Sequence, residues 1–175
     1  MNLEINVENV IKANTQFWEQ MLTMTLETAP ISEAICMESG HLLGAVVLDG
    51  VWKGRIEIRI ATNLAYEATA AMMMQARETV ESSDVLDAAK EIANMVAGTI
   101  KSSLPRPCTM SVPESRMEDT GICFAPRTEN TLSVAFRHTS GDLMVRIREQ
   151  QGGADSPSDV VENPSMKIES PATAQ

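Results

Sequence analysis

The sequence predicts an α+β fold in which long helices pack on a mainly antiparallel β-sheet. Residues 83–104 repeat apolar side chains at about 3.6 residues per turn, which is the period of an α-helix. The apolar side of this helix is wide enough to rest on a sheet or on another helix. Before and after it, short β-rich runs are separated by glycine-containing breaks that are typical of hairpins, so neighbouring strands should run antiparallel.

The chain begins with a predicted helix over residues 7–28, which has a broad apolar side and which Pro30 ends. Three predicted strands follow, separated by Ser-Gly and Asp-Gly breaks, at residues 31–38, 41–48 and 52–60. In the last of these, charged residues alternate with apolar ones, which is typical of a strand that shows one face to solvent. The alternating charged residues are Lys53, Arg55, Glu57 and Arg59.

A second helix is predicted over residues 63–77, with Asn63 as its cap, and it should pair over the sheet with the helix at residues 83–104. Ser82 or Ser83 can cap the start of this longer helix, and the prolines that follow it end it. Four further strands are predicted, the last two joined as a hairpin, at residues 109–112, 121–125, 131–138 and 143–148.

Four residues of the helix at residues 83–104 lie opposite its apolar stripe, namely Asp87, Glu91, Asn94 and Gly98. Steps of four, three and four bring them close to one line along the helix surface. Polar residues in this position usually form a solvated face and nothing more. Asparagine, however, is a mediocre residue for the middle of a helix, because its side chain competes for backbone hydrogen bonds. The four residues are therefore the candidate site.

Composition limits the class of partner. The 175-residue chain has a formal charge of −10, which argues against a nucleic-acid partner because binding a phosphate backbone requires a basic face. Residues 1–149 are predicted to form one domain. Residues 150–175 have no periodicity and are rich in glycine, proline, serine and aspartate, so we expect a disordered acidic tail there.

The cysteines and histidines offer no metal site or nucleophile motif. Cys36, Cys108 and Cys123 lack CxxC spacing, and an odd number without a signal peptide fits a reducing cytoplasm, where they would be small buried or half-buried residues. His41 and His138 are isolated, so a zinc site is not expected. The amino terminus has no secretory features and no apolar run is long enough to cross a bilayer, so we expect a cytoplasmic protein with no membrane partner.

The pattern Asp87-x-x-x-Glu91-x-x-Asn94, continued by Met-Val-Ala-Gly, resembles the signature helix of the CheC/CheX/FliY phosphatases of bacterial chemotaxis. The order of the predicted elements agrees with that family, and residues 52–58 resemble the strand that precedes the helices in CheX. The resemblance covers about residues 5–149. A single copy of Glu-x-x-Asn is similar to the CheX-like branch, since CheC-type members often carry two.

The resemblance implies a phosphatase that hydrolyses the phosphoaspartate of a CheY-like response-regulator receiver. Asn94 would orient the attacking water, Glu91 would dock to a lysine of the receiver, and Asp87 would support the interface. Helix geometry, and not the resemblance, adds Gly98 as a small residue that would leave room for close approach of the partner. The protein would have no cofactor of its own, because the receiver supplies Mg²⁺, and it would form a homodimer through sheet edges.

Three alternatives remain open at the level of sequence. The same fold can serve as a non-catalytic adaptor that binds a receiver, or as a component of the flagellar switch. A self-contained hydrolase would instead use Cys108 or Cys123 as nucleophile with His138 as base. No phosphate-binding glycine loop or nucleophile-elbow motif is present, so most of any active site would have to come from a partner.

Overall fold

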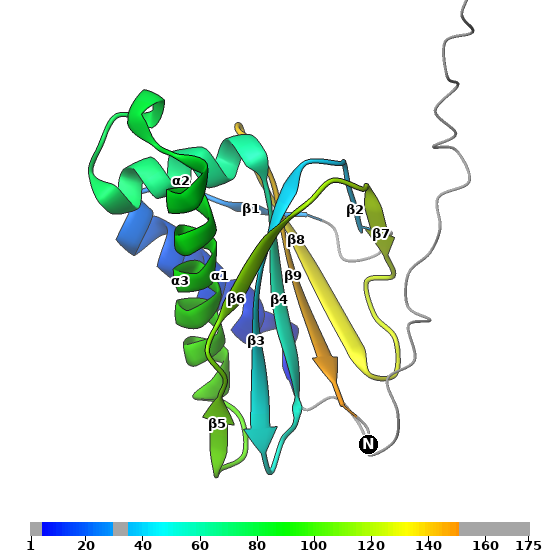
Figure 1. Ribbon diagram of the computed structural model, residues 1–175. Coiled ribbons are helices and arrows are strands. Elements are labelled where there is room, and N and C mark those ends of the chain that lie inside the picture. Colours follow the sequence, from blue (N-terminus) through cyan, green and yellow to red (C-terminus); the bar gives the residue numbers. More distant parts are fainter. Residues whose placement is uncertain (1–4, 30–34, 151–175) are drawn as a thin grey trace, which may run out of the picture.

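The computed structural model describes residues 5–29 and 35–150 (Figure 1). The helices are α1 (Val7–Leu22), α2 (Thr62–Met73), the 3₁₀ turn η1 (Arg77–Thr79) and α3 (Ser82–Lys101). The strands are β1 (Glu27–Thr28), β2 (Ile35–Met37), β3 (His41–Gly50), β4 (Gly54–Ala61), β5 (Cys108–Met110), β6 (Glu114–Glu118), β7 (Ile122–Phe124), β8 (Thr131–His138) and β9 (Gly141–Glu149). The predicted acidic tail lies outside the described residues from position 151 onward.

The predicted fold class is confirmed: three helices cover one face of an antiparallel sheet (Figure 1). The sheet order is β1-β8-β9-β4-β3-β5, and β6 also pairs with β3. A separate two-stranded sheet, β2-β7, lies on the other side of the large sheet from the helices (Figure 1). The largest core fills the space between helices and sheet, and its fully buried members include Trp18, Leu42, Ile58, Ile92 and Phe136.

Helix α1 is shorter than predicted, ending at Leu22 rather than at residue 28. Thr23 adopts the left-handed conformation at φ 58°, and the Met24 N–H donates to the Trp18 carbonyl at 2.9 Å, which closes the helix end. The chain then reverses into β1, whose Thr28 pairs with Phe136 of β8. The predicted end at Pro30 is therefore wrong: the helix has ended earlier in the chain, and residues 27–28 pair with the distant strand β8 instead.

Helix α3 lies within one residue of its predicted start, but its cap differs. Glu81 is the N-cap, and it forms a capping box with Asp84, whose carboxylate accepts from the Glu81 N–H at 3.0 Å. Below the helix, Gly44 of β3 permits unusually close contact, since a Cβ at Gly44 would lie 2.3 Å from the Ala89 carbonyl oxygen. The backbone of α3 therefore rests directly on the backbone of β3.

Two of the three predicted hairpins are confirmed. Residues 51–53, directly after the Asp-Gly pair, join β3 to β4, and residues 139–140 join β8 to β9. The Ser-Gly break does not form a hairpin, because β2 pairs with β7 instead of β3. Strand β6 was not predicted, and it pairs with β3 from His41↔Glu118 to Ala45↔Glu114. Asn63 is not the cap of α2, since its side chain instead accepts from Arg77 at 3.1 Å.

The charged side of β4 is largely buried, so the predicted solvent face is wrong. Glu57 and Arg59 are 6% and 4% exposed, and they pair with each other at 2.8 Å. Phe124 of β7 covers the charges, its ring centre lying 4.9 Å from the Arg59 guanidinium and 4.2 Å from that of Arg146. Burial raises the pKa of Glu57, but Arg59 and Arg55 lower it by more, so the carboxyl is ionised. Ion pairing makes this burial possible.

His41 and Glu118 extend this buried cluster to β6. The two ring nitrogens of His41 lie 2.9 Å from the Glu38 carbonyl and 2.9 Å from the Glu118 carboxylate, so both nitrogens face acceptors. The hydrogen bond from His41 lowers the pKa of Glu118, burial opposes this, and Arg59 and Arg116 lower the pKa further, to about 2 from 4.5. The unfolded chain therefore takes up the Glu118 proton more readily than the folded protein does.

We expect Glu118 to stabilise the fold above pH 4.5, and this stabilisation to be lost as the pH falls from 4.5 toward 2. Urea denaturation at several pH values in this range measures the effect. The Glu118→Gln variant should be less stable than the native protein at pH 6, and its free energy of unfolding should fall less steeply on acidification. Parallel pH profiles for the two proteins would contradict the prediction.

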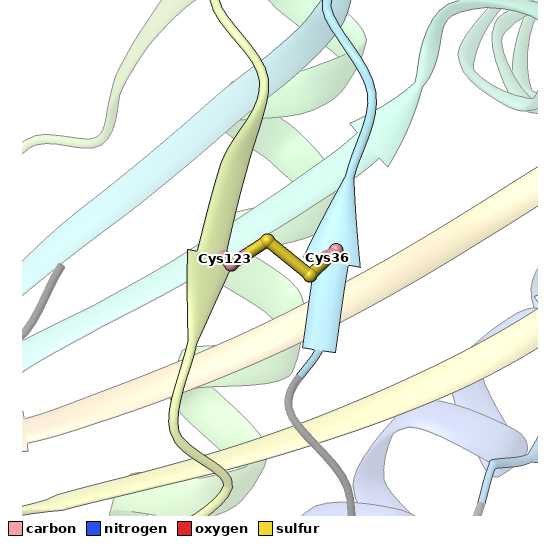
Figure 2. Close-up of a disulfide and its surroundings, with 2 residues drawn as sticks. All are labelled: Cys36 and Cys123. Atoms are coloured by element: carbon pink, nitrogen blue, oxygen red, sulfur yellow. A yellow bond between two sulfur atoms is a disulfide. The ribbon is translucent and has the colours of Figure 1, made fainter. Parts of the chain in front are cut away.

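Cys36 and Cys123 form a disulfide between β2 and β7 (Figure 2). They occupy directly paired positions of the two strands. The expectation that these two cysteines are simple small residues is therefore wrong. Their 87-residue separation in sequence left no local sign of the pairing. Cys108 is a free, half-buried thiol, as expected.

Candidate functional site

Helix α3 presents the four predicted site residues on its outer side, away from the core. Asp87 and Glu91 are exposed, while Asn94 and Gly98 are half-buried. The buried residues of the helix face the sheet and the other helices, and they are Val85, Ala88, Ala89, Ile92, Ala93, Val96, Ala97 and Ile100. The structure thus brings the four residues together along one face of α3, as their spacing predicted.

The Asn94 side chain has no hydrogen-bond partner among the residues that the structure describes. The side-chain nitrogen and oxygen of Asn94 both reach solvent, because neither belongs to the buried polar atoms that lack a hydrogen-bond partner. A carboxamide can donate to one group and accept from another at the same time. The Asn94 carboxamide is therefore free to donate to and accept from groups outside the fold.

Glu91 lies one turn before Asn94, and within the described part of the chain its carboxylate forms no ion pair. Asp87 differs, because Lys90 donates to its carboxylate at 2.8 Å. Both carboxylates are exposed to solvent. Glu91 is thus available to a cation from outside the molecule, whereas Asp87 already has one within it.

Gly98 completes the site on its carboxyl-terminal side. A Cβ built at this glycine meets no atom within 4 Å, so the space above it is open. The contrast with Gly44 is sharp, because there a Cβ would overlap the helix backbone. Close packing inside the fold requires a glycine at position 44, while none of the described residues would crowd a Cβ at position 98.

The outer face of α3 carries negatively charged residues on its first half and a neutral residue, Asn94, after them. Asp84, Asp87 and Glu91 lie on the first half of the helix, and Asn94 follows them. Lys90 offsets part of this charge through its pair with Asp87. A partner that docks here should therefore present a cation toward Glu91, next to whatever group faces Asn94.

The Cys/His hydrolase alternative is wrong. Cys123 is bonded to Cys36, so it is not a free nucleophile. Cys108 pairs with Gly50 at one end of β3, while His138 pairs with Gly141 near the opposite end of the sheet. The ten residues of extended β3 from His41 to Gly50 span about 30 Å, which is far beyond the reach of a nucleophile and its base.

One cavity, of about 670 Å³, lies away from α3. Its lining includes Thr23, Glu67, Arg137 and His138, and none of the four α3 site residues. Within the described ranges, no group of three or more His, Cys, Asp and Glu side chains is arranged to hold a metal ion. Among the same residues, no helix combines the length and apolar character needed to span a membrane.

Comparison with known proteins gives a consistent result. The model of the family described as chemotaxis phosphatase CheX matches residues 42–137. No curated protein matches the chain. A CheC-like superfamily protein from Shewanella sp. PV-4 is similar in structure at 19% identity, with a TM-score of 0.67, and the match covers 86% of this chain and 100% of that one.

Two further solved structures show the same fold. The chemotaxis protein CheX from Vibrio vulnificus has 19% identity and a TM-score of 0.66, with 82% of this chain and 95% of that chain covered. A chain of the CheX–CheY–BeF3–Mg²⁺ complex from Borrelia burgdorferi has 15% identity and a TM-score of 0.63, with 85% and 100% covered. At such identities these structures support the fold, and the family model supports the family.

Proposed function

The chain belongs to the CheX family of chemotaxis phosphatases, and we propose that it hydrolyses the phosphoaspartate of a CheY-like response-regulator receiver. The observation that carries this proposal is the outer face of α3, where Asn94 and Glu91 point to solvent without partners among the described residues. An exposed helix face of this kind fits into the pocket of another protein. The Borrelia relative, whose structure is that of a complex with CheY, supports a partner of this type.

In this mechanism Asn94 orients the attacking water. Phosphoryl transfer requires little covalent chemistry from the enzyme, so placing the water in line with the breaking bond is a large part of catalysis. The carboxamide of Asn94 accepts a hydrogen bond from the water or donates one to it, and it carries no charge that would repel the phosphoryl oxygens. The half-buried position of Asn94 on a packed helix restricts its motion and thereby favours one orientation of the water.

Glu91 docks the helix to the receiver. Its free carboxylate meets a lysine of the partner, and the ion pair aligns α3 so that Asn94 reaches the phosphoryl group. Asp87 supports the same interface through the Asp87–Lys90 pair. The open space above Gly98 lets the partner approach the helix backbone closely.

The receiver supplies the Mg²⁺ that phosphoryl transfer uses to neutralise charge. The phosphatase therefore contributes position, and its partner contributes the metal and the phosphorylated aspartate. Phosphate release from a phosphorylated CheY-like receiver, measured with and without this protein in the presence of Mg²⁺, tests the proposal. Faster release with the protein supports a phosphatase, while binding without acceleration supports a receiver-binding adaptor instead.

We expect Glu91→Ala to weaken receiver binding by about tenfold and to slow dephosphorylation at low receiver concentration, because one partner of a docking ion pair is lost. Glu91→Gln, which keeps the shape and removes the charge, should reduce the salt dependence of binding. Isothermal titration calorimetry at two ionic strengths measures both effects.

The matched control is Glu129→Gln, which removes the same charge from an exposed residue between β7 and β8. It should leave affinity and dephosphorylation unchanged. Equal effects of Glu91→Gln and Glu129→Gln would mean that only the net charge matters, and would contradict a docking role for Glu91.

A further inference from the structure

The Cys36–Cys123 disulfide joins an exposed cysteine to a buried one. Cys36 of β2 is exposed, whereas Cys123 of β7 is 7% exposed. The bond lies between the two strands of the small sheet, on the side of the molecule away from the helices (Figures 1 and 2). A thiol in solution can therefore reach Cys36 without any prior unfolding of the large sheet.

The small sheet has few other means of staying closed. Among the residues that the structure describes, three pairs join β2 to β7, and an isolated pair of short strands is marginally stable in water. Apolar contacts hold it to the large sheet through Met37, Phe124 and Met144. The disulfide is thus a major part of what keeps the two strands together.

The surface beneath the small sheet gains hydration if the sheet opens. Glu57, Arg59 and Arg146 are nearly buried under Phe124, and burying charges costs hydration free energy that ion pairs only partly return. Opening loses the contacts of Phe124 and Met37 but returns water to these charges. Because these two contributions to the free energy oppose each other, removal of the disulfide shifts the balance toward the open state.

We propose that Cys36–Cys123 is a thiol–disulfide exchange site for small dithiols, and that its reduction releases the β2–β7 pair from the charged face of the large sheet. A dithiol thiolate attacks the Sγ of Cys36, the S–S bond breaks, and its electron pair leaves on the Sγ of Cys123, which takes a proton from water. The second thiol of the reagent then attacks the mixed disulfide and expels the Cys36 thiolate. The two cysteines gain two electrons, and the dithiol becomes a cyclic disulfide.

The first test follows the sulfurs. The full-length protein, purified without reductant, is treated with dithiothreitol, and free thiols are labelled with iodoacetamide and counted by mass spectrometry. One label, on Cys108, is expected before treatment, and three labels are expected within minutes after it, with no denaturant present. Three labels before treatment would overturn the proposal, as would a disulfide that dithiothreitol reduces only after unfolding.

The second test follows the strands. Hydrogen exchange of peptides that cover residues 35–37 and 122–124 should become about tenfold faster or more on reduction, while peptides from β4 and α3 stay unchanged. Cys36→Ser should exchange like the reduced protein, and the matched variant Cys108→Ser should exchange like the oxidised one. Reduction without faster exchange at these peptides would overturn the release of the strand pair. If Cys36→Ser fails to fold, the reduced native protein still decides the outcome.

Discussion

Asn94→Ala is expected to slow receiver dephosphorylation by about 100-fold, because the loss of one positioning group in the transition state typically has an effect of this size. Binding of the receiver should change little, since the Glu91 carboxylate, which we propose docks the receiver, stays in place. Single-turnover phosphate release measures the rate, and calorimetric titration measures the affinity. The combination of a lower rate with an unchanged affinity separates water positioning from docking.

Two further variants sharpen this prediction. Asn94→Asp has the same shape but carries a negative charge, so it should be at least as slow as Asn94→Ala because it repels the phosphoryl oxygens. Thr99→Ala changes an exposed polar residue of the same helix, and this variant should hydrolyse at the native rate. Native activity in Asn94→Ala would contradict the mechanism, provided that the native protein itself acts on the same receiver.

Gly44→Ala is expected to lower the free energy of unfolding by about 1–3 kcal/mol, because it adds an atom to a tightly packed interface. The new Cβ would lie 2.3 Å from the Ala89 carbonyl oxygen and 3.1 Å from the Cβ of Ala93. Backbone atoms on both sides must shift, so α3 moves away from β3 and takes the site with it. Urea denaturation measures the loss of stability, and the dephosphorylation rate should fall as well.

Gly98→Ala is the matched control for Gly44→Ala, because it makes the same change on an open surface of α3. A glycine inside a helix costs roughly 0.5–1 kcal/mol relative to alanine, so this variant should be more stable than the native protein. Slower dephosphorylation in this more stable variant would support close approach of the partner at Gly98. A stability loss equal to that of Gly44→Ala would contradict the packing argument.

The helix that carries the site was predictable because its evidence is local. The period of its apolar residues defines the buried side of α3, and the same spacing places Asp87, Glu91, Asn94 and Gly98 opposite to it. The hairpins β3–β4 and β8–β9 were predictable for the same reason, because the residues that form each turn are neighbours in the sequence. The α+β class follows from these elements alone.

The features that sequence reasoning missed depend on contacts between distant segments. Strand β6 has five residues with little apolar character, and its place beside β3 depends on pairing with residues more than 65 positions earlier in the chain, from His41↔Glu118 to Ala45↔Glu114. The polar side of β4 has the alternation of a solvated strand, yet Phe124 of β7 packs over Arg59, and Glu118 of β6 pairs with Arg59. The order of polar and apolar residues within one strand does not indicate which distant segment will cover that strand.

Cysteine pairing and the neighbours of each glycine were likewise decided by tertiary structure. Cys36 and Cys123 meet because β2 and β7 pair across 87 residues, and the number of cysteines alone is compatible with no bond at all. The sequence alone does not distinguish Gly44 from Gly98. A Cβ at Gly44 would meet the backbone of α3, whereas a Cβ at Gly98 would lie in open space. Periodicity within a segment determines its own shape and its buried side, whereas burial of charge, disulfide pairing and close backbone contact depend on which segments meet in space.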